Sequence, residues 1–89
     1  MVRHISILVT GKVQGVFFRA TTKAKADELG IKGFVRNQPD GRVYIEAEGD
    51  PVVLSAFESW CKTGPPRARI ERLDVTGGDL KFYSDFSIQ

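Results

Sequence analysis

The stretch Gly11–Ala20, with the sequence GKVQGVFFRA, contains a helix start that no side chain caps. An alternating apolar run ends at two glycines, and the residues from Arg19 onward have the spacing of a helix. No Ser, Thr, Asp or Asn stands where this helix would begin, so its first backbone N–H groups have no side-chain acceptor. Such groups point outward and, together with the helix dipole, favour a bound anion.

Two residues in this stretch could complete an anion site. Gly15 allows the backbone to turn so that consecutive N–H groups face one point. Arg19 adds a planar guanidinium that can bind two oxygens of a phosphate or carboxylate group. The alternative is a plain glycine turn beside a surface arginine, and the spacing alone does not decide between the two interpretations.

Asn37 ends a second apolar segment and precedes the turn sequence QPDG. Its carboxamide offers both a donor and an acceptor without charge, which would suit the positioning of a water molecule near an anion. Taken by itself, however, Asn37 is more typical of a polar residue that opens a turn.

Residue counts exclude several other chemistries. The chain has one cysteine, Cys61, and one histidine, His4. They cannot form a disulfide, an iron–sulfur or C-x-x-C site, a histidine metal site or a recognisable Ser-His-Asp triad. We interpret His4 as an outward-facing structural residue of a strand. The sequence also lacks the G-x-x-x-x-G-K-[ST] motif of nucleotide-binding loops.

The segment Cys61–Arg67 has the C-x-x-x-x-x-R spacing of cysteine phosphatases. The phosphate loop of those enzymes needs a run of backbone N–H donors, and Pro65 and Pro66 remove two of them. Cys61 also falls at the C-terminal end of a predicted helix, where the dipole disfavours a thiolate. We therefore interpret Cys61 as a buried structural residue.

The elements that must position these residues follow the order strand, helix, strand, strand, helix, strand. This order predicts an α+β, ferredoxin-like split βαβ sandwich, in which two helices pack on one face of an antiparallel sheet. The first and third strands should be central, and we expect the second strand beside the first. The predicted elements are strand 3–10, helix 19–29, strands 31–37 and 42–48, a helix that begins at Pro51 and closes at Gly64-Pro65, strand 68–75 and a short last strand over 82–88.

Local patterns add finer expectations. Gly30 should end the first helix, and Asp50 with Pro51 should cap the second. A phase shift in the fourth strand predicts a bulge near Glu71 and Arg72. In the third strand, alternation predicts a core face and a face that meets water, the latter carrying Arg42, Tyr44, Glu46 and Glu48.

Size and composition are those of one small domain covering residues 1–89. A net charge of +2 suits a small anionic ligand and is too mild to indicate nucleic acid. We expect no signal peptide, and no run approaches the roughly 20 apolar residues that span a membrane. A single cysteine suits a reducing compartment, so we expect a cytoplasmic protein. We expect no membrane partner, and a chain of 89 residues with both helices amphipathic on one side is consistent with a monomer.

Two segments carry a family resemblance. Val9–Arg19, VTGKVQGVFFR, and Gly33–Gly49, GFVRNQPDGRVYIEAEG, resemble the two signature segments of the acylphosphatase family. The first has the pattern apolar-x-G-x-V-Q-G-V-x-F-R and the second G-aromatic-V-R-N-x-x-x-G-x-V. Every motif position matches, although Phe34 stands where many members carry Trp. The order and length of the predicted elements are also similar to the family.

The resemblance implies a single acylphosphatase-like domain that hydrolyses the carboxyl–phosphate bond of small acylphosphates, without metal, cofactor or phosphoenzyme. Arg19 would hold the phosphate, and Asn37 would orient the attacking water. Inorganic phosphate or sulfate would bind as a product-like ligand. The phosphate would also receive hydrogen bonds from the backbone N–H groups of Gln14, Gly15, Val16, Phe17 and Phe18.

Two other functions remain open for this fold. One is a non-catalytic anion- or RNA-binding module, and the other is an accessory role of the kind that such domains have in larger proteins. An RNA-binding third strand needs basic and aromatic residues, but RVYIEAE offers one aromatic, Tyr44, beside two glutamates. The pairing of Arg19 with Asn37 favours the hydrolase, because a binder has no use for a water-positioning amide.

Overall fold

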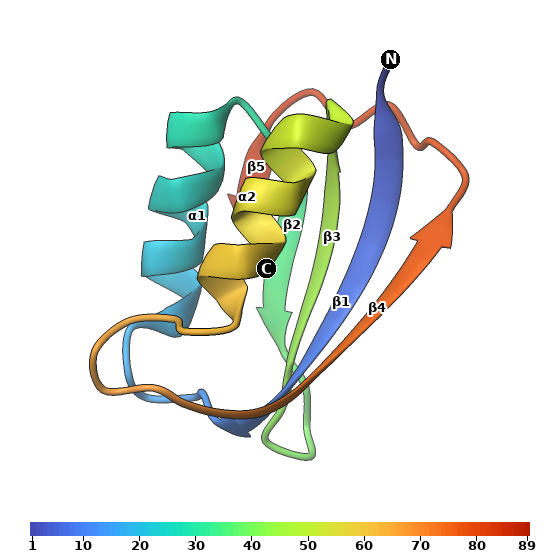
Figure 1. Cartoon of the computed structure of the whole chain (residues 1–89). Coiled ribbons are helices and arrows are strands. Elements are labelled where there is room, and N and C mark those ends of the chain that lie inside the picture. Colours follow the sequence, from blue (N-terminus) through green and yellow to red (C-terminus); the bar gives the residue numbers. More distant parts are fainter.

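The computed structural model describes residues 1–89 and has two layers, with both helices on one face of a five-stranded sheet (Figure 1). The predicted α+β, ferredoxin-like fold is thereby confirmed. None of the helices is both long enough and apolar enough to cross a membrane. The elements are β1 (Arg3–Lys12), α1 (Phe18–Leu29), β2 (Lys32–Asn37), β3 (Val43–Gly49), α2 (Pro51–Cys61), β4 (Arg69–Gly78) and β5 (Phe86–Ile88).

The strand order is β4-β1-β3-β2-β5. β1 and β3 are the central pair as predicted, but the expectation that β2 lies beside β1 is wrong. The connection through α1 leaves room for one strand between β1 and β2. β3 occupies this position and pairs antiparallel with both β1 and β2. The antiparallel prediction holds for four strands, whereas β5 pairs parallel with β2. β2 and β5 consequently end at the same edge of the sheet.

The core lies between the sheet and the helices. Alternate residues of the central strands, such as Ile7 and Ile45, are fully buried against Phe57 of α2. Each of the two helices buries one face. The buried helix residues are Phe18, Thr22 and Ala26 in α1 and Leu54, Phe57 and Cys61 in α2.

The predicted bulge in β4 is also confirmed. Thr10 pairs with Arg72 and Gly11 pairs with Ile70, so Glu71 has no partner in β1. Gly11 has φ 142°, and a Cβ atom there would lie 2.0 Å from the Arg69 carbonyl oxygen. Only glycine fits this close approach of two backbones, which fixes the point where β1 leads into the next loop.

The outer face of the sheet differs from the prediction. His4 and Glu48 were expected to face water, yet only 5% and 4% of their surfaces are exposed. The segment between β4 and β5 covers them, and its Lys81 and Tyr83 N–H groups donate to Glu48. The same segment corrects the predicted last strand, because Phe82 lies outside it with φ 59° and β5 begins at Phe86.

Candidate functional site

The loop between β1 and α1 has an alternating backbone. Gly15 has φ 72° and Phe17 has φ 62°, whereas Val16 between them does not have a positive φ. Such alternation turns successive N–H groups toward one side and forms an anion-binding concavity. None of the N–H groups of residues 14–17 donates to a backbone carbonyl. The buried side chains of Val16 and Phe18 hold the loop against the core.

The start of α1 lacks a side-chain cap, as predicted. Phe17 occupies the N-cap position, and its carbonyl accepts hydrogen bonds from the N–H of Thr21 at 3.0 Å and from the Thr21 hydroxyl at 2.7 Å. The predicted contrast with α2 needs correction, because the Asp50 side chain makes no capping hydrogen bond either. The two starts differ instead in backbone conformation, which is left-handed at Phe17 and extended at Asp50.

The Gln14 side chain joins this loop to the turn between β2 and β3. Its Nε2 donates to the carbonyl oxygens of Gln38 at 2.8 Å and Arg42 at 3.0 Å. In the turn itself, the N–H of Gly41 donates to the Gln38 carbonyl at 3.1 Å, and Gly41 has φ 95°, as the QPDG sequence predicts. Sequence reasoning considered only the backbone of Gln14 and missed this tether, which fixes the loop relative to Asn37.

Arg19 and Asn37 line one cavity of about 300 Å³, together with Gly15, Phe17 and Phe18. The structure therefore brings together five of the seven predicted site residues. The backbones of Gln14 and Val16 belong to the same loop, but these two residues do not line the cavity. The remaining lining residues are Val13, Ala20 and Ile88.

Arg19 is half-buried and forms no ion pair with a carboxylate side chain. Its Nη1 donates to the backbone carbonyl of Gln89 at 3.2 Å, and the Gln89 N–H donates to the Val35 carbonyl at 2.8 Å. Because β5 runs parallel to β2, Gln89, which follows β5, lies beside the start of α1. The positive charge of Arg19 stays free to attract an anion into the cavity.

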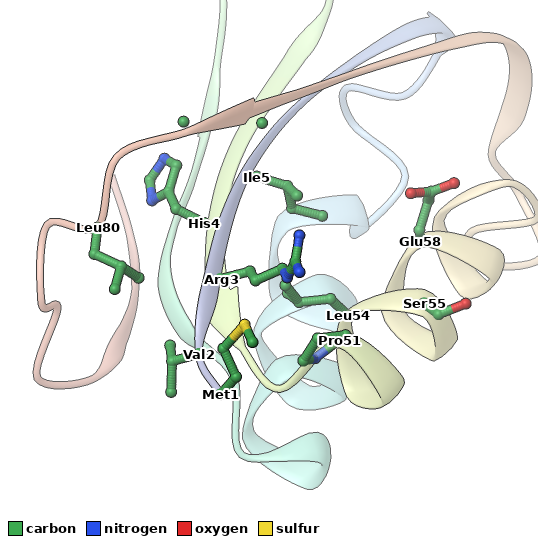
Figure 2. A pocket seen from close by; sticks show the side chains of 12 residues that line it. Met1, Val2, Arg3, His4, Ile5, Pro51, Leu54, Ser55, Glu58 and Leu80 are labelled. Carbon is green, nitrogen blue, oxygen red and sulfur yellow. The ribbon is translucent and has the colours of Figure 1, made fainter.

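Two further cavities lie elsewhere. One, of about 490 Å³, is at the opposite end of β1, where Figure 2 shows Arg3 of β1 and Ser55 and Glu58 of α2 around it. The other, of about 590 Å³, is lined by residues 66–68 before β4, by the start of β4 and by Lys12, and it includes Arg67 and Arg69. Neither contains a predicted site residue. The structure also has no group of three or more His, Cys, Asp or Glu side chains that could hold a metal ion.

The structure confirms the interpretation of Cys61. The residue is fully buried in the core, and burial, followed by the nearby charge of Glu58, raises the pKa of its thiol to about 12. A thiol with this pKa is protonated at neutral pH and is a poor nucleophile. The phosphatase-like spacing from Cys61 to Arg67 is therefore a coincidence of sequence.

Comparison with known proteins finds relatives along nearly the whole chain. Residues 5–88 match the acylphosphatase family. An acylphosphatase of Marinobacter nauticus is 57% identical over 81 residues, covering 91% of this chain and 86% of that protein. Another, of Ligilactobacillus salivarius, is 52% identical and covers 97% of each. The crystal structure of an acylphosphatase from Bacillus subtilis superposes with a TM-score of 0.95 at 38% identity, covering 100% of this chain and 99% of that one.

Proposed function

The chain belongs to the acylphosphatase family and hydrolyses acylphosphates, and from this premise we propose that the loop before α1 binds the phosphate while Asn37 orients the attacking water. The observation that carries the proposal is the shared cavity, because Arg19 and Asn37 come from distant elements and line the same small space. A cation, free N–H groups and a neutral amide around one cavity suit the phosphate group of an acylphosphate.

The phosphate is held by electrostatics. In this proposal the N–H groups of residues 14–18 donate to the phosphate from the loop, and the guanidinium of Arg19 binds it from the start of α1. Charge that develops on the equatorial oxygens during phosphoryl transfer meets fixed dipoles that need no rearrangement. By analogy with other oxyanion sites, one such donor contributes about 10²–10³ to kcat.

Asn37 acts on the water. Its side chain is exposed at the end of β2, on the cavity wall that faces the loop. The amide oxygen accepts a hydrogen bond from the water, whose oxygen then attacks phosphorus while the bond to the carboxylate breaks. The proton of the water passes to a phosphate oxygen of the substrate. The carboxylate is a good leaving group, so positioning supplies most of the catalysis.

The proposal is tested by hydrolysis of benzoyl phosphate in the presence of excess chelator. We expect turnover that the chelator does not change and that is flat in pH near neutrality, because no protein side chain transfers the proton. Loss of turnover with chelator would contradict the mechanism. Absence of any turnover would favour the alternative, a module that binds anions without hydrolysis. A cytoplasmic location and a monomeric state stay predictions.

A further inference from the structure

The cavity that contains Arg19 and Asn37 also has an apolar rim. Phe17 is 76% exposed and Ile88 is 43% exposed, and both line this cavity although they come from the α1 start and from β5. Exposed apolar side chains scattered singly need no explanation, but two that line the same polar cavity indicate a binding surface. Of the charged side chains, only that of Arg19 reaches the cavity.

The backbone conformation of Phe17 also indicates a binding surface at this cavity. A left-handed conformation is uncommon for a residue other than glycine, and for a bulky side chain it is an outlier. Phe17 is held there with φ 62° and ψ 22° by the two hydrogen bonds from Thr21. Strain of this kind gathers at ligand-binding sites, where the surrounding structure maintains it. Here it keeps an aromatic ring in water beside the phosphate loop.

We propose that Phe17 and Ile88 form the subsite for the acyl group, and that the enzyme prefers acylphosphates with an apolar, aromatic acyl group over small or charged ones. This inference rests on the proposed function of the same site. Because the phosphate binds at the N–H groups around Phe17, the acyl group that it carries must leave the loop within reach of the Phe17 ring. A second negative charge on the acyl group would find no cation there, since Arg19 is occupied by the phosphate.

The expected selectivity is moderate. An aromatic ring that stacks on Phe17 gains roughly tenfold in binding beyond what a methyl group gains. Because the reacting bond is next to the acyl carbonyl, the contact persists in the transition state and should appear in kcat/KM.

The test compares kcat/KM for benzoyl phosphate with that for acetyl phosphate in the wild type, Phe17→Asn and Phe17→Leu. Asparagine tolerates the left-handed conformation, so this variant removes the ring without new backbone strain. The ratio of the two substrates cancels any effect on phosphate binding, which both share. We expect Phe17→Asn to lower the ratio about tenfold, with an intermediate ratio in Phe17→Leu and a smaller loss in Ile88→Ser.

Phe82 provides a matched control. It is also a phenylalanine with positive φ (59°) and is 81% exposed, but it lines none of the cavities. Phe82→Asn should leave the substrate ratio unchanged. A ratio in Phe17→Asn within twofold of the wild type, or an equal fall in Phe82→Asn, would overturn the inference while hydrolysis of acetyl phosphate left the proposed function standing. Absence of hydrolysis of either substrate by the wild type would overturn both.

Discussion

Two polar regions occupy opposite ends of β1 and use their polar groups differently. At the start of the strand, His4 lies under the segment between β4 and β5, and its Nδ1 is 2.8 Å from the Glu48 carboxylate. Glu48 also accepts from the Lys81 N–H at 2.6 Å, and Glu46 accepts from the hydroxyls of Tyr44 and Tyr83. At the other end, the N–H groups before α1 have no backbone acceptor, and Arg19 has no carboxylate partner.

The difference teaches where binding energy is available. In the His4 cluster, made of His4, Tyr44, Glu46, Glu48 and Tyr83, the polar groups are already satisfied by one another, so the cluster holds the covering segment in place. Beside the Arg19 cavity the loop N–H groups have no backbone acceptor, so a bound anion could gain hydrogen bonds that the protein itself does not make. Titratable groups are therefore concentrated in the structural region here, whereas unsatisfied donors mark the site that we propose.

The pKa values agree with a structural cluster. Burial alone would raise the pKa of the Glu48 carboxyl, but hydrogen bonds from the Lys81 N–H and His4 bring it below its ordinary value. Burial likewise opposes the lowering of the Glu46 pKa, which the Tyr83 and Tyr44 hydroxyls cause. Burial and the contact with Glu46 raise the pKa of the Tyr83 hydroxyl far above its ordinary range. Both carboxyls are therefore ionised at neutral pH.

The largest expected effect is that of Arg19→Ala. Removal of the guanidinium should lower kcat/KM for an acylphosphate by about 10²–10³ and weaken inhibition by inorganic phosphate. In the proposed mechanism this charge contacts the phosphate both in the bound ligand and in the transition state. Steady-state kinetics with phosphate as inhibitor measures both effects. Arg3→Ala, at the cavity shown in Figure 2, is the control and should change neither. Near-normal activity in Arg19→Ala would contradict the proposal that the active site lies at the start of α1.

Asn37→Ala should have the second-largest effect on activity. We expect kcat to fall about 10²-fold while inorganic phosphate still inhibits as in the wild type, because the amide positions water and not the phosphate. The same kinetic measurements separate the two quantities. A rise in the phosphate inhibition constant with unchanged kcat would show that Asn37 binds the anion instead.

Glu48→Gln tests the other region, and its effect should fall on stability alone. Because the folded pKa of Glu48 is lowered, its contribution to stability is full above the unfolded value near 4.5 and is lost as pH falls through the folded value. The free energy of unfolding of the wild type, measured in urea, should therefore fall below about pH 5. The variant should lose about 1–3 kcal/mol at pH 7 and show a shallower acid dependence.

Asp27→Asn, which alters an exposed pair with Lys23 on α1, is the matched control for this variant and should change stability by under about 1 kcal/mol. Activity per folded molecule should stay normal in Glu48→Gln at pH 7. A fall in kcat comparable with that of Asn37→Ala, in protein that remains folded, would break the distinction between the two regions.

Cys61→Ser should have the smallest effect on catalysis. The protonated, buried thiol takes no part in the proposed reaction, so kcat should match the wild type even though a buried hydroxyl costs some stability. Iodoacetamide should likewise leave activity intact in folded protein. Inactivation by either change, without unfolding, would revive a role for the Cys61–Arg67 spacing.

The sequence predicted the elements other than the last strand, and it predicted five of the residues that line the Arg19 cavity, because both depend on local signals. The uncapped helix start, Gly15 and Arg19 lie within one short motif, and a matching second motif carries Asn37. The covered outer face escaped prediction because it depends on a distant contact. Alternation in β3 distinguishes two faces but cannot reveal that residues near Tyr83 return over one of them.

Two other features could not be predicted from the sequence, for related reasons. The place of β2 depends on which gap β3 fills, and hairpin signals in the sequence do not specify it. The left-handed backbone at Phe17 contradicts the usual preference of a bulky residue, so propensity argued against it. Such a departure from local preference is expected at a functional site, where binding compensates for the strain.

The most direct test of the account is a titration of ¹⁵N-labelled protein with inorganic phosphate, followed amide by amide in NMR spectra. We predict saturable shifts of the backbone N–H signals of residues 14–18 and of the Arg19 side chain, with the His4 cluster unmoved. Shifts confined to the basic cavity of Lys12, Arg67 and Arg69, with the loop before α1 unchanged, would contradict the central claim that unsatisfied donors at the α1 start bind the phosphate.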